Sequence, residues 1–151
     1  MCGLTGFWGP AAAADHIASR AQAMSERIVR RGPDDHGVWV EAEIGLALSH
    51  RRLAILDPSP AGHQPMCSAS GRWVIAYNGE VYNHLRLRAE LQDGGVAPEW
   101  RGHSDTETLL ACIEAWGVEP TLRRMVGMFA IALWDRERRE LWLARDRMGE
   151  K

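Results

Sequence analysis

Two periods in the spacing of apolar residues divide the chain into expected helices and strands. Helical spacing predicts one helix from Asp15 to about Arg30, a second from about Asn83 to Gln92, and a third opened by Ser104. Alternating or continuous apolar runs between the helices predict strands. The expected strands cover residues 3–8, 38–41, 44–49, 72–77, 128–134 and 140–145.

Short polar segments join most of these strands and favour hairpins. The charged segment 135–139 connects the last two strands, and Asn78-Gly79 is a turn dipeptide directly after strand 72–77. A long loop covers residues 58–71, and Pro120 opens a further short helix. Hairpins indicate antiparallel sheets with helices packed outside them, which is an α+β fold and not a doubly wound parallel sheet.

The composition is that of one ordinary globular domain. The 151 residues are 46% apolar and 25% charged, with a net charge of -2. This net charge gives no sign of the excess of basic residues that binding to nucleic acid or an anionic membrane requires. No apolar run is long enough to span a bilayer. The N-terminus lacks the basic and apolar regions of a secretory signal, so we expect a cytoplasmic protein.

Cysteine and histidine usage narrows the chemistry. The three cysteines, Cys2, Cys67 and Cys112, form no CxxC pair, which fits a reducing cytoplasm. Cys67 lies in an expected loop and Cys112 in an apolar helix, so we interpret both as structural. The six histidines show no metal-ligand spacing, and we therefore predict no metal site.

Cys2 is the first candidate for chemistry, because it is the second residue of the chain. Its small side chain favours removal of Met1, which would leave a thiol and a free α-amine on one residue. A thiol is a strong nucleophile, and a neighbouring amine can act as its base near neutral pH. Position alone does not decide the matter, since a cysteine can also stand second without a role.

Two pairs of neighbouring residues lie at strand ends. Asn78 offers a side-chain N–H and Gly79 a backbone N–H, so the pair could hold an oxyanion, although a hairpin turn is the simpler local interpretation. Arg51 and Arg52 should point to opposite faces of their strand, which would place one in a cleft and one in solvent. A guanidinium in a cleft suits a carboxylate, but two solvated charges fit the pattern equally well.

Two further polar segments could belong either to a binding site or to the local structure of the chain. Asp105 stands at the opening of a helix, where it could bind an ammonium group or act as a first-turn acid favoured by the helix dipole. The segment 31–34, Arg-Gly-Pro-Asp, forms a tight polar loop that could equally be a helix stop.

Taken together, these segments resemble the glutamine amidotransferase domain of the class II, N-terminal-nucleophile type. The resemblance is strongest to the N-terminal half of glutamine-hydrolysing asparagine synthetases. The matching pieces follow the family's order along the whole chain. They are Met1-Cys2-Gly3 with Gly6, 31–34 (RGPD), 50–57 (HRRLAILD), 62–66 (GHQPM), 77–84 (YNGEVYNH), 104–107 (SDTE), 127–130 (GMFA) and 144–147 (ARDR).

The resemblance implies an αββα sandwich, four layers with two antiparallel sheets between helices. It implies that Cys2, freed of Met1, attacks the side-chain amide of L-glutamine, that the α-amine is the base, and that a thioester forms as ammonia leaves. Asn78 and Gly79 would then form the oxyanion hole.

The same resemblance assigns the substrate-binding residues. Arg52, and not Arg51, would hold the α-carboxylate of glutamine, and Asp105 would hold the α-ammonium. Glu80 and the backbone of Leu53, Ala54, Ile55 and Leu56 would line the pocket, and Arg31 would support the surroundings of the nucleophile.

Family domains continue past the position of Lys151 into more sheet and an ATP-dependent synthetase domain. Residues 1–151 are therefore expected to be a C-terminally incomplete amidotransferase domain without a cofactor, with ATP and Mg in the missing synthetase domain normally present in cis. No Walker-type loop occurs here. An unpaired edge at 140–145 invites pairing with a second copy, so a homodimer is among the expectations.

Two alternatives to asparagine formation stay open. Ammonia could be delivered to a sugar or a cell-envelope precursor, because acceptor specificity would lie outside this chain. The chain could also be a non-catalytic module that binds glutamine without turnover.

Overall fold

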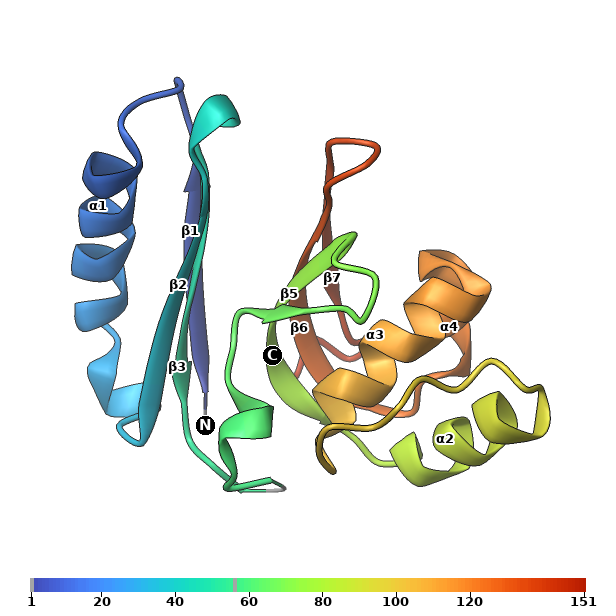
Figure 1. The fold of residues 1–151 in the computed structure, drawn as a ribbon. Helices are drawn as coiled ribbons and strands as arrows, with labels where there is room; N and C mark the ends of the chain where they lie inside the picture. The colour runs from blue at the N-terminus through green and yellow to red at the C-terminus, as the bar shows by residue number, and fades with distance from the viewer. Residues whose placement is uncertain (1, 56) are drawn as a thin grey trace.

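Two antiparallel sheets face each other at the centre of the molecule, and helices cover their outer faces (Figure 1). The computed structural model describes residues 2–55 and 57–151. The first sheet has the order β1-β3-β2 and the second β4-β5-β6-β7. The strands are β1 Gly3–Trp8, β2 Asp35–Glu41, β3 Leu46–Arg52, β4 Met66–Cys67, β5 Trp73–Val81, β6 Gly127–Asp135 and β7 Glu140–Arg145.

The helices form the two outer layers. Helix α1 (Ala14–Glu26) lies against the first sheet, and α2 (His84–Asp93), α3 (Asp105–Trp116) and α4 (Val118–Arg124) lie on the far side of the second (Figure 1). Three short 3-10 turns lie in the connections, η1 Val29–Arg31, η2 Ala42–Ile44 and η3 Pro60–Gly62. The four layers are therefore helix, sheet, sheet and helix, as expected.

Strand β3 is buried along its whole length because it is central in its sheet and covered on both faces. Leu46 and Leu48 pack in one cluster with Val74, Ala132 and Trp134 of the second sheet. The alternate residue Ala47 packs against Ile17 and Ala21 of α1. The alternation of a strand thus divides its side chains between the sheet interface and the helix layer.

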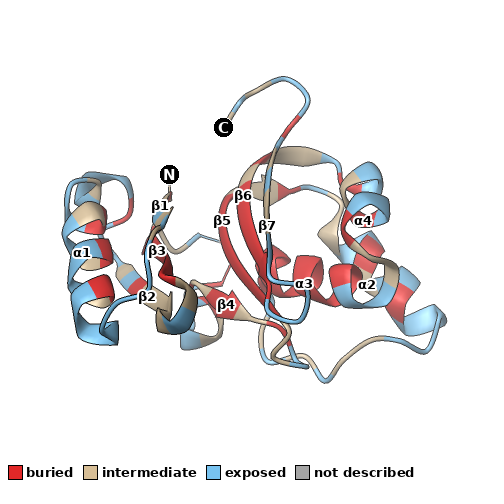
Figure 2. Ribbon diagram, turned by 90° about the horizontal axis from the view of Figure 1, so that it is seen from above, coloured by how far each residue is buried: buried red, intermediate tan, exposed pale blue. Residues whose placement is uncertain are grey.

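Strands β5 and β6 carry the largest part of the core. Figure 2 shows both as largely buried, between the first sheet and the helices. Ile75 and Leu133 belong to the cluster with the helices, whereas Val74 and Trp134 belong to the cluster between the sheets. This double burial explains why the sequence here is continuously apolar and not alternating.

The predicted turn at Asn78-Gly79 is wrong. Strand β5 continues through both residues to Val81, and Gly79 lies opposite Phe129 in the ladder with β6. A Cβ on Gly79 would overlap the carbonyl oxygen of Met128, so the absence of a side chain serves close strand pairing.

The helix boundaries also differ from the sequence pattern. Helix α1 begins at Ala14 and ends at Glu26, and Asp15 lies in its first turn and does not cap it. Ser104 does cap α3, and its hydroxyl accepts from the Glu107 amide at 3.2 Å. The Glu107 carboxylate accepts instead from loop amides 101 and 102, so only half of the expected capping box forms.

Smaller differences concern the strands and the last helix. Strand β4 lies within the expected loop 58–71, and β3 ends at Arg52, three residues later than expected. Helix α4 begins at Val118, before Pro120. Strand β1 has the expected bounds.

Arg51 does not face solvent, in contrast to the expectation for one of the two adjacent arginines. Its side chain is buried under α1, and its Nε donates to the carbonyl and to the hydroxyl of Ser25, both at 3.2 Å. Arg51 and Arg52 do point to different surroundings, but the outer face of β3 is covered by a helix.

His50 bridges the two sheets with a polar contact inside the core. It is fully buried on β3, and its Nε2 lies 2.9 Å from the carbonyl oxygen of Tyr77 on β5. Burial lowers the pKa of His50 from 6.5 to about 4. At pH values between 4 and 6.5, this imidazole is therefore neutral in the folded protein but protonated in the unfolded chain.

This burial predicts a loss of stability in mild acid. Between pH 6.5 and pH 4, His50 is protonated in the unfolded chain but neutral in the folded protein. The free energy of unfolding therefore falls as the pH falls through this window. The loss attributable to His50 is about 3 kcal/mol over the whole window, of which about 2 kcal/mol is reached by pH 5. Urea unfolding of the wild type and of His50→Gln at pH 7, 6 and 5 measures it.

The glutamine side chain can keep a donor toward the Tyr77 carbonyl, but it does not titrate. The difference in stability between the two proteins should therefore shrink steadily as the pH falls. A difference that is the same at all three pH values would contradict the assignment.

Candidate active site

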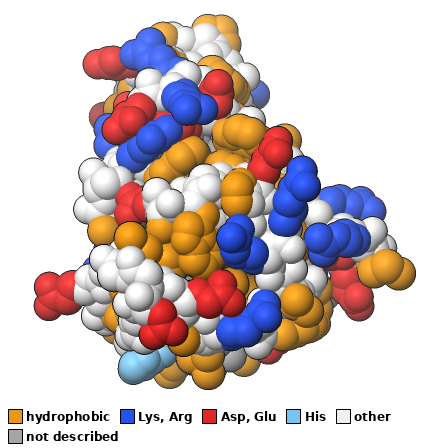
Figure 3. Space-filling model, turned by 90° about the vertical axis from the view of Figure 1, so that its right-hand side faces the viewer, with side chains coloured by type: hydrophobic (Ala, Val, Ile, Leu, Met, Phe, Trp, Pro, Cys, Tyr) orange, Lys and Arg blue, Asp and Glu red, His pale blue; other side chains and the backbone are white. Residues whose placement is uncertain are grey.

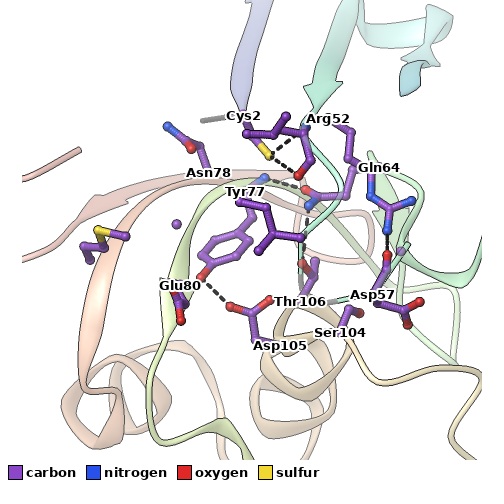
Figure 4. Close-up of a pocket in the computed structure, with 15 residues that line it drawn as sticks. Cys2, Arg52, Asp57, Gln64, Tyr77, Asn78, Glu80, Ser104, Asp105 and Thr106 are labelled. Atoms are coloured by element: carbon purple, nitrogen blue, oxygen red, sulfur yellow. Dashed lines mark hydrogen bonds between the residues drawn. The ribbon is translucent and has the colours of Figure 1, made fainter. Parts of the chain in front are cut away.

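A pocket of about 110 Å³ opens where the two sheets meet the N-terminal end of α3 (Figure 4). Its lining joins the start of β1, the end of β3, the last part of β5 and the first turn of α3. The lining residues are Cys2, Arg52, Leu53, Ile55, Asp57, Gly62, Gln64, Tyr77, Asn78, Gly79, Glu80, Ser104, Asp105, Thr106 and Met128.

Most of the residues singled out from the sequence meet in this pocket. Ala54 lines a neighbouring hollow instead, and its amide donates to the Asp34 carboxylate at 2.9 Å. Arg31 stands behind the pocket, and Leu56 and Met1 lie outside the described residues. The residues expected from the sequence that do line the pocket are Cys2, Arg52, Leu53, Ile55, Asn78, Gly79, Glu80 and Asp105.

The Cys2 sulfur is held by the backbone of a single residue. The Leu53 amide donates to Sγ at 3.3 Å, and the thiol donates to the Leu53 carbonyl at 3.6 Å. Arg31 Nε donates to the Cys2 carbonyl at 3.0 Å and fixes the backbone of the same residue. Antiparallel pairing of Gly3 with Arg51 brings these segments together. The thiol is thus aimed at the pocket from a fixed backbone.

Arg52 is buried at the wall of the pocket, and loop carbonyls accept two of its hydrogen bonds. Nη1 donates to the Ser59 carbonyl at 2.9 Å, and Nη2 donates to the Asp57 carbonyl. Asp35 lies 4.0 Å from Nη1. A guanidinium has five N–H donors, so these two bonds leave capacity for a carboxylate.

Asn78 and Gly79 approach the pocket from β5. Asn78 is only 8% exposed, and no residue in the described part of the chain hydrogen-bonds its amide group. Both polar atoms of that side chain are therefore left for a ligand, and the pairing of β5 with β6 fixes the strand that carries them.

Asp105 is the first residue of α3 and is 5% exposed. Its Oδ2 accepts from the Tyr77 hydroxyl at 2.8 Å and from the Val81 amide at 2.9 Å. The two interpretations left open by the sequence are compatible, because Asp105 is a first-turn acid and also lines the pocket.

Seven lining residues were not singled out as site residues from the sequence: Asp57, Gly62, Gln64, Tyr77, Ser104, Thr106 and Met128. Gln64 accepts from the Tyr77 amide at 2.7 Å and donates to the Thr106 hydroxyl at 3.3 Å. Tyr77 contacts Asp105, and burial, reinforced by that carboxylate, raises the pKa of its phenol far above its usual value. All seven lie inside the ordered motifs, which were the only signal that could have found them.

Two further properties concern the described residues as a whole. Within them, no three or more His, Cys, Asp and Glu side chains are grouped so as to hold a metal ion, and no helix could cross a membrane.

Figure 3 shows basic and acidic side chains interspersed with apolar ones on the face covered by the helices of the second sheet.

Comparison with known proteins decides the family. The model of a glutamine amidotransferase domain matches residues 1–151. This chain belongs to that family. It is 42% identical to a putative glutamine-hydrolysing asparagine synthetase of Mycobacterium tuberculosis, 39% to asparagine synthetase 3 of Bacillus subtilis and 36% to asparagine synthetase B of Escherichia coli. The alignments cover 99–100% of this chain but 24–26% of the relatives.

A solved structure supports the fold. Glutamine phosphoribosylpyrophosphate amidotransferase from B. subtilis matches with a TM-score of 0.78 at 20% identity, over 99% of this chain and 38% of that one. The predicted α+β sandwich and the resemblance to glutamine amidotransferases are both confirmed.

The environments of the three cysteines predict selective labelling. A glutamine analogue that carries an electrophile at the position of the side-chain amide should modify Cys2, which lines the pocket. It should spare Cys112, which is fully buried with its pKa raised to about 12, and half-buried Cys67, which is not part of the pocket lining. Peptide mass spectrometry measures the modification of each thiol. Equal labelling of Cys2 and Cys67 would show that the pocket does not direct the reagent.

Proposed function

We propose that this chain hydrolyses glutamine to glutamate and ammonia through a thioester on Cys2. The observation that carries the proposal is the convergence of four groups of different chemistry on one pocket. A thiol, an unpaired amide, a guanidinium and a carboxylate line it, from Cys2, Asn78, Arg52 and Asp105. These are the groups that an α-amino acid with a side-chain amide requires.

The charged groups orient the substrate. Arg52 would bind the α-carboxylate with its remaining N–H donors, and Asp105 would bind the α-ammonium. Two opposite charges on different walls fix both ends of the amino acid, so that its side-chain amide reaches Cys2. Binding at a distance from the reacting atoms then lowers the entropic part of the barrier.

The reaction itself would use the two groups of Cys2. After removal of Met1, the α-amine takes the thiol proton, and sulfur attacks the amide carbon. The oxygen becomes negative and accepts hydrogen bonds from Asn78 and Gly79. Collapse of this intermediate forms the thioester and releases ammonia, which takes its proton from the α-ammonium. Water then attacks the thioester and releases glutamate.

Leu53 and Arg31 support the nucleophile in this proposal. The Leu53 amide donates to the sulfur and fixes its position, while Arg31 holds the Cys2 carbonyl. Glu80 and Ile55 also line the pocket.

The use of the ammonia is the wider part of the proposal. The chain spans about a quarter of the length of the asparagine synthetases that it matches. We assign the ammonia to ATP-dependent amidation of aspartate in the cytoplasm, by a synthetase domain in cis that holds ATP and Mg. A homodimer formed through the free edge of β7 belongs to the same proposal.

The purified chain should release glutamate and ammonia from glutamine in equal amounts. Asn78→Ala should lower kcat by roughly 100- to 1000-fold and change KM much less, because an oxyanion donor acts on charge that develops in the transition state. Coupled assays of glutamate and ammonia measure both constants.

The chain offers a matched control in Asn83, its other asparagine. The Asn83 side chain bonds the backbone of Arg124 and Val126 at 2.9 Å, away from the pocket. Asn83→Ala should reduce stability but leave kcat close to that of the wild type. A full kcat in Asn78→Ala together with a raised KM would move Asn78 from catalysis to substrate binding.

A further inference from the structure

Tyr77 is held by three hydrogen-bond contacts beside the pocket. It lies on β5 directly before Asn78 and is 2% exposed. Its amide donates to Gln64 at 2.7 Å, and its carbonyl lies 2.9 Å from His50 Nε2. Its ring packs in the core cluster beneath the helices, and only its hydroxyl reaches a charged group.

That hydroxyl makes the two oxygens of Asp105 unequal. Oδ2 accepts both recorded bonds, from Tyr77 at 2.8 Å and from the Val81 amide at 2.9 Å. No residue in the described part of the chain donates to Oδ1. Two donors on one oxygen fix the plane of the carboxylate, and the second oxygen is then left for a ligand in the pocket.

The direction of the Tyr77–Asp105 bond is also set. Burial, together with the neighbouring carboxylate, raises the pKa of Tyr77 far beyond any working pH, so the phenol keeps its proton. The hydroxyl therefore always donates to Asp105. The ring is 2% exposed and packs in the core cluster, which limits how far the hydroxyl can turn away.

We propose that Tyr77 is a positioning residue that holds Asp105 with Oδ1 directed at the α-ammonium of glutamine, and thereby sets the preference for an α-amino substrate. The inference rests on the proposed function. Tyr77 itself touches no reacting atom. Its effect passes through Asp105, so it should appear in substrate selection and not in the chemical step.

A pair of substrates isolates this effect. Glutaramate is glutamine with hydrogen in place of the α-ammonium, so it keeps the carboxylate and the side-chain amide. A site built to bind a polar group discriminates against an analogue that lacks it. In Tyr77→Phe the ring stays and one donor is lost, which lets Asp105 pivot about its bond to the Val81 amide.

We expect Tyr77→Phe to raise KM for glutamine about tenfold, as for loss of a hydrogen bond to a charged group, with kcat within about threefold. The kcat/KM for glutaramate should stay near the wild-type value. The preference for glutamine over glutaramate should therefore fall about tenfold. The matched control is Tyr82→Phe, because Tyr82 is the other tyrosine of the chain and is 59% exposed. It should leave both substrates unaffected.

Each outcome separates this inference from the proposed function. An equal loss for both substrates in Tyr77→Phe would mean a general structural role and would overturn the inference, while glutamine hydrolysis by the wild type would stand. If the wild type hydrolyses no glutamine, the proposed function fails. Calorimetry then compares glutamine and glutaramate binding to Cys2→Ala with and without Tyr77→Phe. Selective weakening of glutamine supports the positioning role, and equal weakening or no binding overturns it.

Discussion

The packing of β3 against β5 is the constraint on which the rest of the structure depends. Along most of this interface the contact is apolar, between Leu46 and Leu48 on one side and Val74 and Ala76 on the other. Burial of such side chains contributes about 1.5–3 kcal/mol each. At one end the apolar contact gives way to the polar contact of His50 with Tyr77. The pocket begins at that point, where β3 ends in Arg52 and β5 carries Asn78 and Glu80 before its last residue, Val81.

Hydrogen bonds order the polar end of the interface, although the buried Nδ1 of His50 has no partner among the described residues. Buried polar groups without partners cost about 1–3 kcal/mol each, which favours arrangements in which they are paired. Gln64 bonds both Tyr77 and Thr106, and Asp105 bonds both Tyr77 and Val81. These bonds tie β5 to α3 and to the segment before β4. The strand that presents Asn78 and Gly79 is therefore held from three sides before any substrate arrives.

Much of the fold could be predicted from spacing alone. The helical periods and the apolar strands correctly predicted antiparallel sheets with helices outside them, because burial of one face or of two faces leaves a clear pattern. The four-layer order came from the resemblance to glutamine amidotransferases. Local rules failed where distant segments intervene. Asn78-Gly79 is a strong turn signal, yet pairing with β6 keeps it extended. Arg51 was expected to face solvent, yet α1 covers it, and its Nε donates to Ser25.

The site was predictable only from the order of its motifs. No local pattern distinguishes a first-turn acid from an ammonium-binding residue at Asp105, and the sequence contains no distance between Arg52 and Asp105. The resemblance to glutamine amidotransferases brought these residues together before the structure did. Tyr77 and Gln64 were not predicted as site residues, because their role depends on hydrogen bonds between β5, α3 and the segment before β4. Such hydrogen bonds depend on how the elements pack, and they produce no regular spacing of residues in the sequence.

The most direct measurement is a crystal structure of the Cys2→Ala variant with glutamine bound. The account predicts glutamine in the pocket with its α-carboxylate on Arg52, its α-ammonium on Asp105 Oδ1 and its side-chain amide between Asn78 and position 2. Glutamine bound in the reverse direction, with its side-chain amide at Asp105, would contradict the account. Glutamine bound outside the pocket would contradict it equally.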